Sequence, residues 1–201
     1  MTTSFVPGML VGLSLIVAIG AQNAYVLRQG LRREHVGLVV AICTLSDLVL
    51  IAAGIAGIGR LVEKAPDAVE VVRWLGVAFL ATYGVLSLWR ARTPDALRAA
   101  DGDAATRPEV ALRAAALTWL NPHVYLDTVL LLGGVAATHG PGGRWTFGTG
   151  AMLASIVWFT GLGFGSRRLH GLLASARAWQ VLEVLIGLTM LAVAASLALG
   201  A

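Results

Sequence analysis

Long stretches without charge are the feature that most restricts how this chain can fold. Residues 5–27 contain no charged side chain, and a helix needs about 20 apolar residues to cross the hydrocarbon core of a bilayer. Further apolar stretches cover residues 36–59, 74–89, 114–138, 145–166 and 178–199. The shortest, 74–89, is flanked by Arg73 and Arg90, whose long side chains can reach outward and extend the span. The sequence therefore predicts an all-α integral membrane protein with six transmembrane helices.

Composition agrees with this class. Of 201 residues, 57% are hydrophobic and 13% are charged, and the charged share is about half that of a soluble domain. A soluble domain of this length could not bury so much apolar surface. The net charge of +4 comes from short connectors rather than from basic runs interleaved with aromatic residues, which argues against nucleic-acid binding. Cys43 is the only cysteine and the histidines lack metal-ligand spacing, so we expect no metal site and no cofactor.

The basic residues are distributed unequally between the connectors. The connectors after the first, third and fifth stretches hold 11 of the 15 Lys and Arg residues, counting Arg28 among them, and the opposite side holds four. Cytoplasmic connectors carry such an excess. The rule predicts a multi-pass protein with both termini on the non-cytoplasmic side.

Two halves of the chain resemble each other. Residues 43–61 align with 151–169, 76–80 with 187–191, and 20–25 with 118–125, where Asn23 falls on Asn121. A flexible cytoplasmic linker, 92–113, would separate a first three-helix repeat, 1–91, from a second, 114–201. Because each half has an odd number of spans, the two would insert with opposite topology, as in many secondary transporters whose site lies near the bilayer midplane. The alternative is that two apolar segments align through composition alone.

Two carboxylates lie where water should be absent. Asp47 is near the middle of residues 36–59, and Asp127 near the middle of 114–138. Each costs about 2.5–3.5 kcal/mol to insert at the centre of a helix. The carboxyl groups could be protonated and bonded to a neighbouring helix, face a wet cavity, or pair with a cation. Arg73 is the nearest plausible fixed cation, because every other arginine lies in or beside a predicted connector. If both ionise, a proton, a metal ion or a cationic substrate would supply the counter-charge.

Amides accompany the carboxylates at points where a helix can break. Asn23 follows Gly20, and Asn121 precedes Pro122, which has no N–H and leaves the carbonyl of Thr118 without its usual partner. Broken helices at membrane depth line cavities, and their ends bind substrate charges. A zwitterion with an extra positive charge would use both kinds of helix end, although Pro122 could also simply kink the helix.

Three motifs, GAQNAYVLRQGLRREHV (20–36), SD (46–47) and TWLNPHVYLDT (118–128), resemble signatures of the LysE/ArgO family of bacterial basic-amino-acid exporters. The resemblance covers nearly the whole chain. It implies export of L-lysine, L-arginine or close analogues from the cytoplasm, across the bacterial inner membrane, driven by the membrane gradient and carried out by a homodimer. The substrate-binding residues that it implies are Gln22, Asn23, Asp47, Asn121, Pro122, Tyr125 and Asp127.

These observations lead to a hypothesis of alternating access without enzymatic activity. Asp47 and Asp127 would attract the substrate cation and one would carry a coupling proton, with Arg73 assisting in coupling or gating. Asn23 and Asn121 would hold the α-amino and α-carboxylate groups. The alternatives are an exporter of the homoserine or threonine type, an ion carrier without organic substrate, and an intramembrane protease with a shared-proton aspartate dyad. The protease is disfavoured because the chain has no Gly-x-Gly-Asp sequence.

Overall fold

The long apolar stretches form helices in the computed structural model, which describes residues 2–17, 20–57, 66–92, 105–121, 124–169 and 176–199. These ranges contain no β-strand, so the predicted all-α class is confirmed for them. In chain order the helices are α1 (Thr2–Ile16), α2 (Ala21–Arg32), α3 (Val36–Ile55), α5 (Pro66–Arg92), α6 (Arg107–Trp119), the π-helix η2 (Tyr125–Leu131), α8 (Leu132–Ala137), α9 (Gly140–Gly165), the 3-10 turn η3 (Ser166–Leu169) and α10 (Ala176–Leu199).

Three of the described helical segments are long and apolar enough to cross a membrane: Val36–Ile55, Gly140–Arg168 and Gln180–Leu199. A fourth candidate is the bent pair Ser4–Ile16 and Ala21–Arg32, whose axes differ by 82°. The apolar helix Tyr125–Ala137 is shorter. The six-span count therefore stays a prediction.

Two stretches that the sequence predicts as single spans, 5–27 and 114–138, are divided. The first is broken between α1 and α2, where Gly20 takes an extended conformation with φ −121° and ψ 174°. In the second, α6 ends at Trp119 and the chain is helical again from Val124. The carbonyl of Thr118 accepts a 3.3 Å bond from the backbone N–H of Asn121. The interruptions fall at the Gly and Asn-Pro sequences, and Pro122 itself lies outside the described residues.

Helix α6 also starts earlier than expected, inside the segment predicted as linker. Thr106 and Glu109 form a capping box at its start, and Pro108 lies in its first turn. Both features favour helix initiation, so the polar sequence before residue 114 is helical from Arg107.

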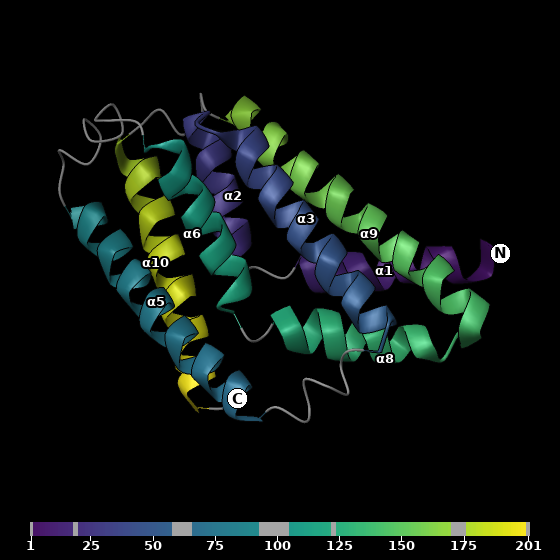
Figure 1. The fold of residues 1–201 in the computed structure, drawn as a ribbon. Helices are drawn as coiled ribbons and strands as arrows, with labels where there is room; N and C mark the ends of the chain where they lie inside the picture. The colour runs from purple at the N-terminus through teal and green to yellow at the C-terminus, as the bar shows by residue number, and fades with distance from the viewer. Residues whose placement is uncertain are drawn as a thin grey trace.

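The helices pair across the two halves of the chain (Figure 1). Helix α1 of the first half packs on α9 of the second, and α8 of the second half packs on α3 of the first. Helices α5 and α10 lie side by side at one edge of the molecule (Figure 1). Among the described elements, this pair meets the rest of the molecule chiefly where α10 contacts α2.

Glycines allow the close helix contacts between the halves. A Cβ atom on Gly54 of α3 would lie 2.8 Å from the backbone oxygens of Thr128 and Val129, and one on Gly133 of α8 would lie 2.7 Å from the backbone oxygen of Gly54. Where α1 meets α9, a Cβ on Gly150 would overlap the carbonyl of Phe5. Such small residues let helix backbones approach closely in membranes.

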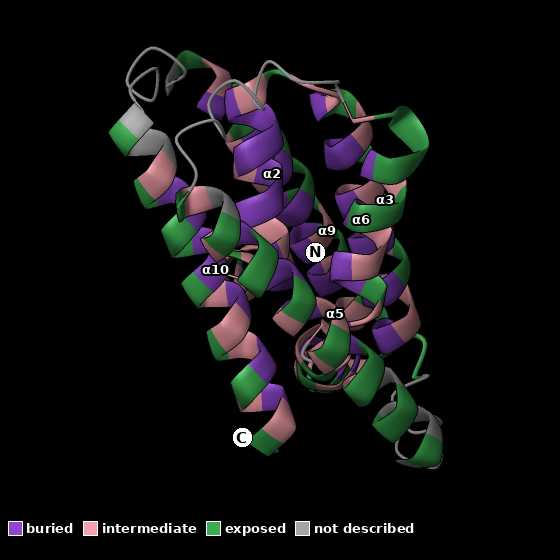
Figure 2. Cartoon of the chain, turned by 90° about the vertical axis from the view of Figure 1, so that its left-hand side faces the viewer, coloured by how far each residue is buried: buried purple, intermediate pink, exposed green. Residues whose placement is uncertain are grey.

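Burial follows the helix interfaces, while many outward side chains are apolar (Figure 2). Tyr25, Leu117 and Phe147 are almost completely buried, whereas Val49 and Leu185 are more than half exposed. An apolar exterior of this kind is suited to lipid contact rather than to water.

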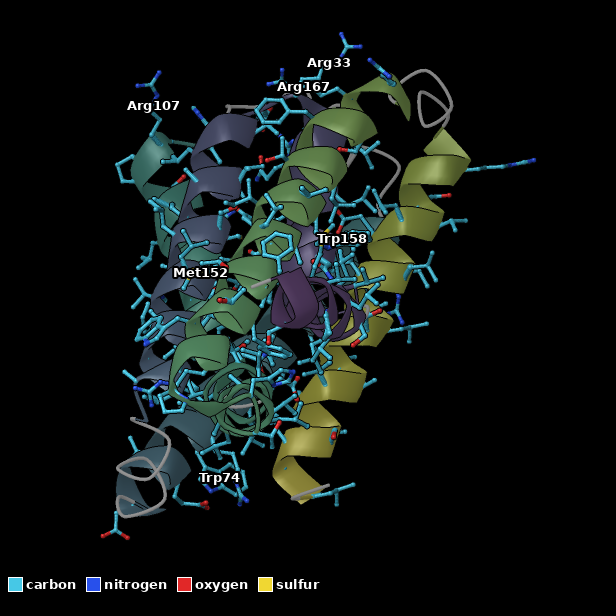
Figure 3. All side chains as sticks on the ribbon, turned by 90° about the vertical axis from the view of Figure 1, so that its right-hand side faces the viewer. Arg33, Trp74, Arg107, Met152, Trp158 and Arg167 are labelled. Carbon is cyan, nitrogen blue, oxygen red and sulfur yellow. The ribbon has the colours of Figure 1, made fainter. Side chains whose placement is uncertain are left out.

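Basic side chains gather at one end of the molecule. Arg33, Arg107 and Arg167 lie at one end and Trp74 at the other (Figure 3). This matches the expectation that the basic connectors share one side. Which side of the membrane that is stays a prediction.

The contact at Gly54 provides a test of the fold. We expect Gly54→Ala to destabilise the protein by about 1–3 kcal/mol, because the added methyl group would push against the backbone of η2. Gly134→Ala, on the neighbouring α8, is the matched control, since a Cβ there meets nothing within 4 Å. Thermal unfolding in detergent measures both. Equal melting temperatures for Gly54→Ala and Gly134→Ala would contradict the packing described.

Candidate functional site

A cavity of about 230 Å³ lies next to both helix breaks. Five of the seven predicted substrate-binding residues line it: Gln22, Asn23, Asp47, Asn121 and Asp127. The rest of the lining is largely apolar or small and includes Leu15, Ile16, Phe159 and Val193. Both halves of the chain therefore contribute walls. Among the described residues that line the cavity, two carry carboxylates and none is a lysine or arginine.

Asp47 projects from α3 and is 5% exposed. Its Oδ2 accepts a 2.8 Å hydrogen bond from the hydroxyl of Ser155 on α9, which is fully buried. The contact joins the two halves beside the cavity. Ser155 is not among the predicted site residues, although the alignment of 43–61 with 151–169 places it opposite Asp47. That correspondence was the available signal.

Asn23 holds the first helix break in place. Its Nδ2 donates to the carbonyl of Ile16 at 2.7 Å, and its Oδ1 accepts from the indole Nε1 of Trp158 at 3.1 Å. The first contact satisfies a carbonyl at the end of α1, where the helix leaves its last carbonyls without partners. The second ties the start of α2 to α9. Much of the Asn23 amide is thus committed to the protein, although the residue also lines the cavity.

Tyr125 closes the second break in a similar way. Its hydroxyl donates to the carbonyl of Trp119 at 2.8 Å, at the end of α6. The indole of Trp119 in turn donates to Ser46 on α3 at 3.0 Å. Tyr125 does not appear in the cavity wall, whereas Asn121, within the break, does. The geometry gives Tyr125 a place in shaping the break rather than in contacting a ligand.

A π-helix carries the second carboxylate. Asp127 and Thr128 line the cavity from η2, Tyr125–Leu131. The hydrogen-bond pattern of a π-helix, i to i+5, is rare and occurs frequently at functional sites. The sequence predicts an ordinary α-helix for this stretch, within the span 114–138. Composition and hydropathy contain no signal that distinguishes a π-helix from an α-helix.

The chain matches the LysE type translocator family over residues 13–201. It belongs to this family. It is 38% identical to the lysine exporter LysE of Corynebacterium diphtheriae, over 96% of this chain and 97% of that protein. It is 37% identical to the arginine exporter protein ArgO of Salmonella schwarzengrund, over 98% of this chain and 94% of that protein. No solved structure matches. The family resemblance drawn from the three motifs is confirmed.

Arg73, another predicted site residue of this LysE-family chain, is not brought to the cavity. The guanidinium of Arg73 pairs with Glu70 at 2.9 Å and lies 5.4 Å from the ring centroid of Trp74. Its charge therefore has a partner on its own helix, and Arg73 is not in the cavity wall. Pro122 lies outside the described residues.

The assignment of Arg28 to a connector is wrong. Helix α2 continues to Arg32, and Arg28 is a helical residue that is 7% exposed. Burial is possible because Glu183 of α10 lies 2.9 Å from its guanidinium. A charged residue directly after an uncharged stretch is typical of a span boundary, and the sequence does not reveal a partner that lies 155 residues further along the chain.

The lining of the cavity predicts which of two neighbouring residues on η2 is accessible to water. In a Cys43→Ala background, we expect Thr128→Cys to react at least about tenfold faster than Val129→Cys with a water-soluble thiol reagent. Thr128 lines the cavity, whereas Val129 is 3% exposed and is packed away from it. Modification rates of the detergent-purified protein, read by mass spectrometry, measure the ratio. Equal rates would mean that the cavity is not hydrated or that η2 faces it differently.

Proposed function

We propose that this chain exports cationic L-amino acids, lysine or arginine, from the cytoplasm by alternating access. The observation that carries the proposal is the meeting of Asp47 and Asp127 in one cavity whose described lining has no basic side chain. Two carboxylates that line one cavity favour a cation there. The names of relatives such as the lysine exporter and the arginine exporter support a basic amino acid as that cation.

The cavity offers a partner for each charge of such a substrate. The carboxylates of Asp47 and Asp127 would attract the side-chain cation and the α-ammonium group. The start of α2 lines the cavity through Gly20, Ala21 and Gln22, and Gly20 makes no side-chain cap. Open backbone N–H groups and the positive end of a helix favour anions, so the substrate α-carboxylate would bind there. Asn121 would complete the polar wall, and Asn23 would mainly keep the break open.

The proposal includes six spans arranged as two inverted repeats. Each half would begin with a broken helix, α1–α2 or α6–η2–α8, followed by a long helix, α3 or α9, and then α5 or α10. Support comes from Asn23 and Asn121, which the alignment pairs and which line the same cavity. The packing of α1 on α9, matched by that of α6 on α3, also fits this plan. Alternating access would expose the cavity to each side in turn.

Proton coupling, orientation in the membrane and homodimeric assembly are inferred from the family resemblance and from the distribution of charge. One carboxylate, Asp47 or Asp127, would carry a coupling proton, so that the membrane gradient drives export. The end that carries Arg33, Arg107 and Arg167 (Figure 3) would face the cytoplasm of a bacterial inner membrane. Homodimeric assembly comes from the family resemblance alone.

Counterflow of labelled amino acids into proteoliposomes tests this function. Across the twenty amino acids, we expect lysine and arginine to exchange and neutral amino acids to do so at least about tenfold more slowly. Asp47→Asn and Asp127→Asn should each abolish exchange of the cationic pair, because each removes a counter-charge from the cavity. Asp67→Asn, at an exposed position in the first turn of α5, is the control and should transport normally.

Monodispersity of each variant in detergent separates loss of transport from loss of folding. Exchange of threonine or homoserine in place of lysine and arginine would instead support a neutral-amino-acid exporter. Undiminished lysine and arginine exchange by both aspartate variants would remove the carboxylates from the mechanism. Repeating the assay with a pH gradient tests the coupling ion.

A further inference from the structure

A second set of buried polar groups joins α2, α5 and α10 outside the cavity. An Nη2–Oε1 distance of 2.9 Å links Arg28 to Glu183, and Arg28 Nη1 donates to the hydroxyl of Tyr83 at 3.1 Å. All three residues are less than 10% exposed. None of them lines the cavity, so the site described above does not account for them.

Stabilisation of the fold does not by itself account for a buried ion pair such as Arg28–Glu183. The desolvation of two buried charges offsets much of their attraction, and well-packed apolar residues often serve equally well. Removing one partner, in contrast, leaves the other charge buried and uncompensated, at a cost of about 3–5 kcal/mol. A buried ion pair therefore makes a contact that is either fully formed or strongly disfavoured. That property suits a two-state closure.

The pair lies where two bodies of the molecule meet. Helices α5 and α10 pack extensively on each other, and among the described elements their main contact with the rest is through α2. The Arg28–Glu183 bridge and the Arg28–Tyr83 bond cross this boundary. Separation of the α5–α10 pair from α2 would have to break both.

Arg28 and Glu183 lie, along their helices, between the cavity and the end of the molecule where the basic side chains gather. On α2, Asn23 lines the cavity and Arg28 lies roughly 7 Å further toward Arg33, at about 1.5 Å per residue. On α10, Val193 lines the cavity, and Glu183 lies roughly 15 Å nearer the start of that helix. Arg33 and Arg167 mark this end of the molecule, and the start of α10 lies toward the same end (Figure 3).

We propose that Arg28 and Glu183, with Tyr83, form the gate that closes the cavity toward the basic end of the molecule. The gate opens when the α5–α10 pair moves away from α2. Opening exposes the Glu183 carboxylate, and a passing substrate cation can replace Arg28 as its partner. The role of the substrate in this inference rests on the proposed function, whereas closure of the cavity by the ion pair does not.

Access to Val193 from each face of the membrane tests the gate. In a Cys43→Ala background, Val193→Cys is probed with a membrane-impermeant methanethiosulfonate reagent in right-side-out and inside-out vesicles. Adding Glu183→Gln, which keeps the side-chain shape and removes the charge, should speed modification at least about fivefold from one face only. Arg28→Lys, which shortens the reach but keeps the charge, should have a smaller effect. The control Glu34→Gln makes the same change in the Arg32–Glu34 ion pair instead and should change neither rate.

A charge reversal and a reversible link complete the test. Arg28→Glu combined with Glu183→Arg should restore slow modification of the cysteine at position 193. Arg28→Cys and Glu183→Cys, joined by a reducible bifunctional thiol reagent, should block transport until the link is reduced. An unchanged rate in Glu183→Gln, or an equal increase from both faces, would overturn the gate. One-sided access with no exchange of lysine or arginine would keep the gate and refute the proposed substrate.

Discussion

Backbone hydrogen bonding at the two helix breaks is the constraint on which the rest of this structure depends. In hydrocarbon there is no water to satisfy a freed carbonyl, and each unpaired group costs several kcal/mol. At each break a side chain donates a hydrogen bond to a carbonyl at the end of the preceding helix. Asn23 donates to the carbonyl of Ile16, and Tyr125 donates to that of Trp119. Because these bonds hold the breaks open, helix ends and polar side chains can face a cavity instead of lipid.

Close packing between the halves then brings the charges together. Glycine contacts between α3 and α8, and between α1 and α9, let backbones approach to distances that larger residues would prevent. As a result Asp47 of the first half and Asp127 of the second share one cavity, and Ser155 bonds Asp47 across the boundary. An acidic cavity to which both halves of the chain contribute is the physical basis of the proposed export of cationic amino acids.

Much of this site followed from the sequence, because polar residues within apolar stretches must be compensated wherever they lie. The helical class follows from the long apolar stretches, and that rule predicts the two breaks and the two carboxylates of the cavity wall. Gln22 came from the family resemblance, and the apolar residues of the wall were not predicted. Features that depend on contacts between residues far apart in the chain could not be predicted from the sequence. Arg28 has the position of a span edge in the sequence, because its partner, Glu183, is far away along the chain. Arg73 is a different case, since Glu70, three residues earlier on the same helix, is a partner that the sequence spacing already offers. The π-helix has no sequence signature. Ser155 could have been found, since the repeat alignment already set it opposite Asp47.

Binding of lysine compared with norleucine, which has the same side-chain carbons without the ammonium group, tests the central claim most directly. Calorimetry on the purified protein should show lysine binding at least about tenfold more tightly, a difference of about 1.4 kcal/mol or more. The combined Asp47→Asn and Asp127→Asn variant should lose this preference, because the cavity would no longer supply a counter-charge. Norleucine binding as tightly as lysine to the unaltered protein would show that the two carboxylates do not select a cation.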